Sequence, residues 1–246
     1  MGNQGPLPQG RKEDIVRALF DRMGGTYASA LGINLAGSDP AELFRWFLAS
    51  ILFGARIGES IAVKTYREFE NTGVVSCATI LKTGWQGLVD ILDRGGYVRY
   101  DFKTATRLLE ITGALQEQHQ GDLNRLHSAA KDEKDLEQKL QELGKGIGPV
   151  TTNIFLRELR EVWKKAKPTL SEPAVLAVRS LGLVKTSKPD LALEELQRLW
   201  EWSTRQGRFS DFEAALVRLG KNFCRKGKCS ACPMKAACLR QRPDKT

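Results

Sequence analysis

Four cysteines lie within fifteen residues near the C-terminal end of the chain, and this cluster constrains the fold more than any other feature. They follow the spacing Cys-x4-Cys-x2-Cys-x5-Cys at Cys224, Cys229, Cys232 and Cys238. Four thiolates in so short a loop can enclose one cubane 4Fe–4S cluster, whose protein ligands are all cysteines. Zinc also takes four such ligands, although zinc modules usually set two pairs of ligands well apart. We therefore expect a 4Fe–4S cluster here, with zinc as the alternative, and we expect the isolated Cys77 to be a small buried residue.

The charge balance of the chain favours a polyanionic partner. Lysine and arginine outnumber aspartate and glutamate by 38 to 29, which gives a net charge of +9 and a pI of about 9.4. Nucleic acid is the commonest polyanion that such a basic protein binds. The sequence has no apolar run long enough to span a membrane, and its first residues lack the apolar core of a signal peptide. We expect a cytoplasmic, nucleoid-associated monomer with no membrane partner.

Apolar residues recur at helical spacing along almost the whole chain, and strand-like alternation is hard to find. The sequence therefore predicts an all-α protein. Ser38-Asp39-Pro40 is typical of a helix start, because a side-chain oxygen there accepts backbone N–H bonds and proline suits the first turn. The expected helices cover residues 12–23, 41–53, 58–70, 85–92, 102–118, 122–143, 149–165, 171–181, 191–203 and 211–219.

A glycine-rich turn joins two of these helices at residues 143–151, with the sequence LGKGIGPVT. Gly144, Gly146 and Gly148 permit positive φ angles and let the backbone approach another surface closely. Ile147 can anchor the turn from inside, and the proline that follows Gly148 suits the first turn of a helix. Such a hairpin presents backbone N–H groups at a helix N-terminus, where they bind one phosphate whatever the base sequence. A tight turn without a ligand is the alternative, but the basic chain favours DNA binding.

The combination of this hairpin with the cysteine cluster resembles the endonuclease III-like, helix-hairpin-helix DNA glycosylases. The resemblance runs in order along nearly the whole chain. Residues 38–43 look like the start of the family's barrel, and residues 51–64 resemble the segment whose side chain wedges into the duplex. Residues 95–105 resemble the next turn, residues 143–152 match the hairpin, and residues 220–238 match the cluster loop.

This resemblance implies two helical lobes. A six-helix barrel with the hairpin would cover residues 39–165, and an iron–sulfur lobe would combine residues 1–38 with 166–246. The resemblance also implies a partner, double-stranded DNA with a damaged or mismatched base, whose altered nucleotide is flipped out of the duplex. The implied DNA contacts are the wedge residue Arg56 and the hairpin residues Gly144, Lys145, Gly146, Ile147, Gly148, Val150 and Thr151. For Arg56, the alternative is an ordinary surface arginine without a role in binding.

Two departures from the family pattern bear on the chemistry. Bifunctional members carry a lysine where this chain has Val150, and valine cannot form a Schiff base, so we expect no strong β-lyase activity. The family's aspartate is replaced by Ser171, which can cap a helix but cannot stabilise a developing positive charge. The neighbouring Glu172 could do so, or could activate a water, if the loop turned by one residue. The alternative is a surface glutamate in the first turn of a helix.

These observations lead to one prediction and one alternative. We predict a base-excision-repair protein, a monofunctional DNA glycosylase that hydrolyses the N-glycosidic bond with Glu172 and Ser171 as its catalytic candidates. The alternative is a non-catalytic, lesion- or structure-specific DNA-binding protein of the same fold. The valine at position 150 and the serine at position 171 favour that alternative.

Overall fold

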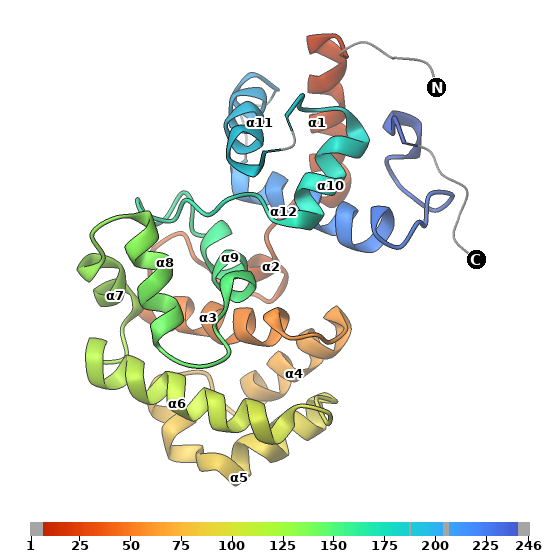
Figure 1. The fold of residues 1–246 in the computed structure, drawn as a ribbon. Coiled ribbons are helices and arrows are strands. Elements are labelled where there is room, and N and C mark those ends of the chain that lie inside the picture. Colours follow the sequence, from red (N-terminus) through yellow and green to blue (C-terminus); the bar gives the residue numbers. More distant parts are fainter. Residues whose placement is uncertain (1–6, 187, 204–206, 241–246) are drawn as a thin grey trace. The chain divides into compact units, whose positions relative to one another are not determined.

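The computed structural model describes residues 7–186, 188–203 and 207–240. In these ranges all regular structure is helical, so the prediction of an all-α protein is confirmed (Figure 1). The chain divides into two compact units. Unit 1 combines residues 1–27 with 169–246, and unit 2 comprises residues 28–168. No helix in the described ranges is long and apolar enough to cross a membrane.

Unit 2 is organised around α3 (Pro40–Gly54), whose sequence is apolar on most sides. Asp39 caps this helix as predicted, because its carboxylate accepts backbone N–H bonds from the first turn, the shorter one at 2.7 Å. The buried indole of Trp46 donates a hydrogen bond of 3.1 Å to the carbonyl of Phe155. Phe155 belongs to α9 (Pro149–Arg157), the helix that follows the glycine-rich hairpin. The central helix therefore holds the hairpin helix directly.

The remaining helices of unit 2 surround α3 and α9. They are α2 (Tyr27–Ala30), which starts at the boundary between the units, α4 (Glu59–Asn71), α5 (Cys77–Gly95), α6 (Asp101–His119), α7 (Leu123–Ala129) and α8 (Glu133–Glu142). Helix α5 packs along α6 and against α4, while α3 packs against α4 and α9. Figure 1 shows α5 and α6 running side by side. The turn between α5 and α6 is thereby fixed at one end of this pair.

The helix predicted over residues 122–143 is in fact two helices, α7 and α8. The backbone is extended at Ala130, and Asp132 then starts α8 by accepting a backbone N–H bond of 2.9 Å. A short acidic side chain at a cap competes with a continuous helix for the backbone groups. The prediction was wrong because the charged surface pattern continues through the break.

Two other helices differ from the prediction by more than three residues at one end. Helix α5 begins at Cys77 and not at residue 85, because Ser76 forms a capping box with Thr79. Gly84 interrupts this helix with a φ of 68°. The hydrophobic periodicity of the residues before Gly84 therefore does not continue into the residues after it. The helix predicted over residues 149–165 ends earlier, at the close of α9, because the chain then forms a series of turns.

Residues 28–38 and 166–168 belong to unit 2, whereas the sequence predicted lobe boundaries at residues 39 and 165. The fully buried carboxylate of Glu158 accepts a hydrogen bond of 2.8 Å from the backbone N–H of Ala28. Arg160 donates a hydrogen bond of 2.6 Å to the carbonyl of Pro168, the last residue of unit 2. These hydrogen bonds attach residues 28–38 and 166–168 to unit 2, and the local sequence pattern does not predict them.

Unit 1 is built from both ends of the chain. Its elements are α1 (Gln9–Met23), α10 (Glu172–Leu181), α11 (Pro189–Ser203), α12 (Phe209–Leu219), the π-helical turn η1 (Gly220–Cys224) and the 3₁₀ turn η2 (Lys235–Ala237). Helix α12 packs against α1 and α10. A Cβ on Gly220 would lie only 1.9 Å from the carbonyl oxygen of Pro173, so only glycine lets η1 approach the start of α10 this closely. This contact places Cys224, the last residue of η1, beside α10.

Candidate nucleic-acid interface

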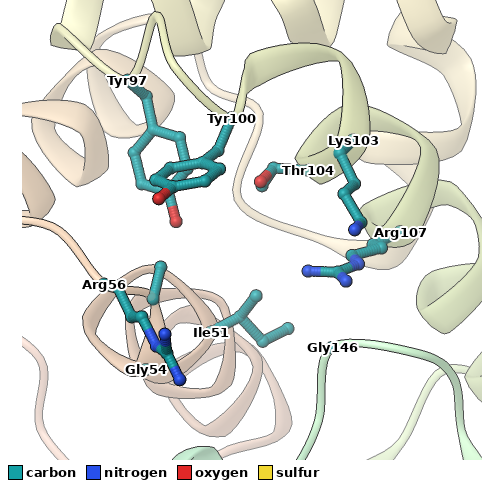
Figure 2. Close-up of a pocket in the computed structure, with 10 residues that line it drawn as sticks. Ile51, Gly54, Arg56, Tyr97, Tyr100, Lys103, Thr104, Arg107 and Gly146 are labelled. Carbon is teal, nitrogen blue, oxygen red and sulfur yellow. The ribbon is translucent and has the colours of Figure 1, made fainter.

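Unit 2 contains a cavity of about 450 Å³. It lies among the C-terminal end of α3, the segment that joins α5 to α6, the first turns of α6 and the hairpin before α9 (Figure 2). Its lining residues are Ile51, Gly54, Ala55, Arg56, Tyr97, Tyr100, Lys103, Thr104, Arg107 and Gly146. A volume of this size falls within the range of ligand pockets in proteins.

Three of the described side chains that line the cavity are cations, and none of those lining it is acidic. Lys103 and Arg107 are four residues apart on α6 and so share one face of that helix. Figure 2 shows both side chains extending from α6 toward the cavity. Arg56 comes from the segment between α3 and α4, and neither it nor Lys103 forms an ion pair within the described ranges. Uncompensated positive charge in a concave site attracts anions.

The buried phenol of Tyr97 in the cavity remains neutral. Tyr97 is only 2% exposed, and burial raises the pKa of its phenol to about 12, although a hydrogen bond with Thr104 and the positive charge of Arg107 act in the opposite direction. The phenol therefore keeps its proton at neutral pH and can donate or accept a hydrogen bond. Tyr100 is half-buried, and the guanidinium of Arg99 lies 5.4 Å from the centre of its ring.

The hairpin has part of the local geometry that the sequence predicted, since only Gly146 of its three glycines has a positive φ angle. Ile147 is buried, and Gly146 has a φ of 119°, which glycine alone adopts readily. Gly148 stands at the N-cap of α9, and no side chain caps this helix start. A Cβ on Gly148 would meet nothing within 4 Å, so the backbone there is open to an approaching group. Lys145 and Val150, on either side of the turn, are exposed.

The structure brings several of the predicted DNA-contacting residues together. A Cβ on Gly54 would lie 2.2 Å from Oγ1 of Thr151, so the end of α3 touches the first turn of α9. The segment with Arg56 therefore lies beside the hairpin, and both Arg56 and Gly146 line the same cavity. Gly144 has a different role, since a Cβ there would meet the side chain of Ile111 at 2.9 Å. It permits the hairpin to pack on α6.

Ser171 and Glu172 lie at the start of α10 in unit 1. Ser171 occupies the N-cap position, but its hydroxyl makes no capping bond and is buried with no partner among the described residues. Pro173 at the second helical position lacks an N–H, which removes one of the two usual donors to a capping side chain. The capping hydrogen bond expected for Ser171 is therefore absent. Glu172 is exposed and forms an ion pair with Arg225 from the cysteine loop.

The four clustered cysteines lie near one another in unit 1. Burial raises the pKa of Cys224 to about 11, a hydrogen bond with Ser180 lowers it, and the charges of Cys232, Cys238 and Cys229 raise it further. Each of the other three sulfurs is therefore within electrostatic range of Cys224. Among the described residues, no three His, Cys, Asp or Glu side chains converge on one point as the ligands of a single ion do.

Several cavity residues were not identified from the sequence as site residues. The segment YVRYDFKTATR, residues 97–107, supplies five of the side chains that line the cavity. The signal that could have identified it is the alternation of aromatic and basic residues, with Arg99, Lys103 and Arg107 at steps of four. This spacing places Lys103 and Arg107 on one side of α6, and the segment that leads into this helix carries two tyrosines.

No family model and no curated protein sequence matches the chain. Among solved structures, the chain is similar to the H. pylori 3-methyladenine DNA glycosylase (MagIII) bound to 1,N6-ethenoadenine. The TM-score is 0.53 at 16% sequence identity, and the match covers 85% of this chain and 94% of that chain. At this identity the likeness shows a shared fold, because function depends on the site and not on the fold alone. The chain has the all-helical fold of a 3-methyladenine DNA glycosylase over most of its length.

Proposed function

We propose that this chain is a DNA-repair protein that binds duplex DNA with a damaged or mismatched base and hydrolyses the N-glycosidic bond of that base. The observation that carries the proposal is the position of the open helix N-terminus at Gly148 beside a cavity with three cations in unit 2. Both features suit a polyanion, and together they suit a nucleotide within a strand. The fold shared with a 3-methyladenine DNA glycosylase supports the same class of activity.

In this proposal unit 2 corresponds to the six-helix barrel of helix-hairpin-helix glycosylases. The first N–H groups of α9 hold one phosphate, and the exposed Lys145 adds positive charge beside it. Arg56 fills the space that the flipped nucleotide leaves, because a guanidinium can stack on neighbouring bases and donate hydrogen bonds to the orphaned base. The contacts to phosphate give affinity, while the cavity supplies selectivity.

The hydrolytic step is assigned to the start of α10. The carboxylate of Glu172 accepts a proton from a water, the water oxygen bonds to C1′ of the sugar, and the bond from C1′ to the base nitrogen breaks. The base leaves with the bonding electron pair and takes up a proton, so the products are the free base and an abasic site. The ion pair with Arg225 orients the Glu172 carboxylate. Ser171, whose buried hydroxyl has no partner among the described residues, is the second proposed catalytic residue.

The four clustered cysteines are the proposed ligands of a 4Fe–4S cluster, with zinc as the alternative, and unit 1 is the proposed iron–sulfur lobe. When bound, such a group acts as a cross-link that orders the loop between its ligands. Cys224 ends η1 and Arg225 follows it, so the same loop that would be fixed by the cluster carries the partner of Glu172. Lys226 and Lys228 lie in this loop and add positive charge toward phosphate.

The second candidate is a DNA-binding protein that does not cut the glycosidic bond. Glu172 is 68% exposed and already paired with a guanidinium, whereas a general base works best when it is partly desolvated and free to take a proton. Val150 and Ser171 also remove the two groups that the family uses for chemistry. These observations favour binding without hydrolysis.

Release of free base from DNA separates the two candidates. Duplexes with an altered base would be incubated with the wild type, with Glu172→Gln and with Glu201→Gln, a matched change at an exposed position of α11. We expect free base with the wild type and Glu201→Gln, and a loss of about hundredfold in rate for Glu172→Gln with unchanged duplex affinity. Selective binding of altered duplexes with no release by any protein would instead establish the binding function.

A further inference from the structure

The cavity of unit 2 has far more hydrogen-bond donors than acceptors among its side chains. Arg56, Lys103 and Arg107 can only donate, and the three hydroxyls of the lining tyrosines and threonine can donate or accept. None of the described side chains that line it is a carboxylate, a carboxamide or an imidazole. The hydrogen bond between Tyr97 and Thr104 also uses one of the few acceptors. A ligand that matches this lining must therefore present acceptors.

The same cavity has apolar surfaces that a phosphate alone would not need. The buried Ile51 lines it, and the ring of Tyr97 is almost completely buried. Figure 2 shows the two tyrosine rings on one side and Lys103 and Arg107 on another. A planar ring with apolar faces and oxygen acceptors at its edge meets both kinds of surface. A nucleobase that carries keto oxygens has this form.

We propose that this cavity receives a flipped base that carries keto oxygens, of the deaminated or oxidised kind, and rejects positively charged N-alkylated bases. The proposal rests on the proposed function, because it takes duplex DNA with an altered base as the partner. An N-alkylated purine such as 7-methylguanine carries a formal positive charge in the nucleotide. The cations Lys103 and Arg107 repel this charge, and N7 of such a base can no longer accept a hydrogen bond from the lining donors. Uracil in contrast offers two keto oxygens and no charge.

The test measures the equilibrium affinity of the full-length protein for three duplexes of one sequence. They contain uracil, 7-methylguanine or a tetrahydrofuran abasic analogue, and an unmodified duplex of the same sequence is the reference. Glu172→Gln is present throughout so that no base is released. Lys103→Met in this background removes one cavity cation. Lys82→Met is its matched control, because it removes the same charge from an exposed position of α5.

We expect tighter binding of the uracil duplex than of the 7-methylguanine duplex. Lys103→Met should weaken uracil binding about tenfold, the loss of one charged hydrogen bond, and should weaken abasic binding much less. Lys82→Met should change both duplexes equally and only slightly. Two results would overturn the proposal: 7-methylguanine bound as tightly as uracil, or an equal loss for the uracil and abasic duplexes in Lys103→Met, which would mean that a phosphate occupies the cavity. If no altered duplex is preferred over an unmodified one, the proposed function itself fails.

Discussion

Gly146 leaves open the space that the side chain of Arg107 fills. A Cβ on Gly146 would lie 3.0 Å from Cδ of Arg107, and the glycine has a φ of 119°. The hairpin and the cavity are therefore in direct contact, and the position of an arginine in the cavity depends on the absence of a side chain in the hairpin. Any substitution of Gly146 should therefore alter both the hairpin backbone and the position of Arg107 in the cavity.

Alanine at the two hairpin glycines separates backbone strain from ligand binding. Gly146→Ala should lower the free energy of unfolding by about 1–3 kcal/mol, because it forces a positive φ and displaces Arg107. Gly148→Ala should change stability by less than about 0.5 kcal/mol, since its Cβ enters open space and its φ is −102°. Gly148→Ala should weaken binding to all duplexes alike, measured as affinity beside urea unfolding, whereas Gly146→Ala should also lower the preference for altered duplexes because it displaces Arg107. A loss confined to altered duplexes would contradict the phosphate role of the hairpin.

A lysine at position 150 should introduce chemistry that the wild type lacks. The side chain of Val150 is 65% exposed, so Val150→Lys can place an amine there without a change to the core. A lysine that attacks C1′ of an abasic site forms a Schiff base, which borohydride reduces to a stable adduct. We expect a covalent protein–DNA product with Val150→Lys and none with wild type. Equal trapping by the wild type would show that another lysine, such as Lys145, supplies this amine.

Loss of one cluster cysteine should remove the metal centre. Cys232→Ser should lower the iron content from about four atoms per chain and abolish the visible absorbance of an iron–sulfur protein. Cys77 is the matched control, because it is buried in unit 2 and burial raises its thiol pKa to about 12. Cys77→Ala should keep the iron. Unchanged iron and absorbance in Cys232→Ser would contradict ligation by that residue, and stoichiometric zinc in the wild type would favour the alternative metal.

The buried phenol of Tyr97 should make the fold sensitive to alkali. Its pKa is about 12 in the folded chain and 10.0 in the absence of burial, so both states are protonated at neutral pH. Between pH 10 and 12 the unfolded chain loses this proton first, and stability should fall by about 2–3 kcal/mol as the pH rises through that window. Tyr97→Phe should show a shallower decline than the wild type in urea unfolding at several pH values. Parallel declines would mean that this phenol does not control the effect.

The parts of the fold that depend on local chemistry could be predicted from the sequence. The cap at Asp39, the anchor at Ile147 and the all-helical class follow from neighbouring residues, and the structure confirms them. The break between α7 and α8 near Ala130 and the early start of α5 at Cys77 were not predicted. A capping residue or a single glycine can end or start a helix without a change in the hydrophobic periodicity.

The cavity could be predicted only in part. Arg56 and Gly146 were expected to contact DNA, yet their joint position on one cavity depends on the contact of Gly54 with Thr151, which is tertiary. Tyr97 was missed because a tyrosine taken alone is more often core, and only the alternation of aromatic and basic residues over 97–107 marks it as a site residue. The proposed role of Glu172 rests on sequence position, and its ion pair with Arg225 could not be read from spacing.

The most direct test of the account uses a uracil-containing duplex and pure protein with its metal centre intact. After incubation, the labelled strand would be analysed with and without alkali, beside Glu172→Gln. We predict cleavage at the uracil position only after alkali, because hydrolysis leaves an abasic site without strand scission, and we predict no cleavage with Glu172→Gln. Absence of alkali-labile sites, together with equal affinity for uracil-containing and unmodified duplexes, would contradict it.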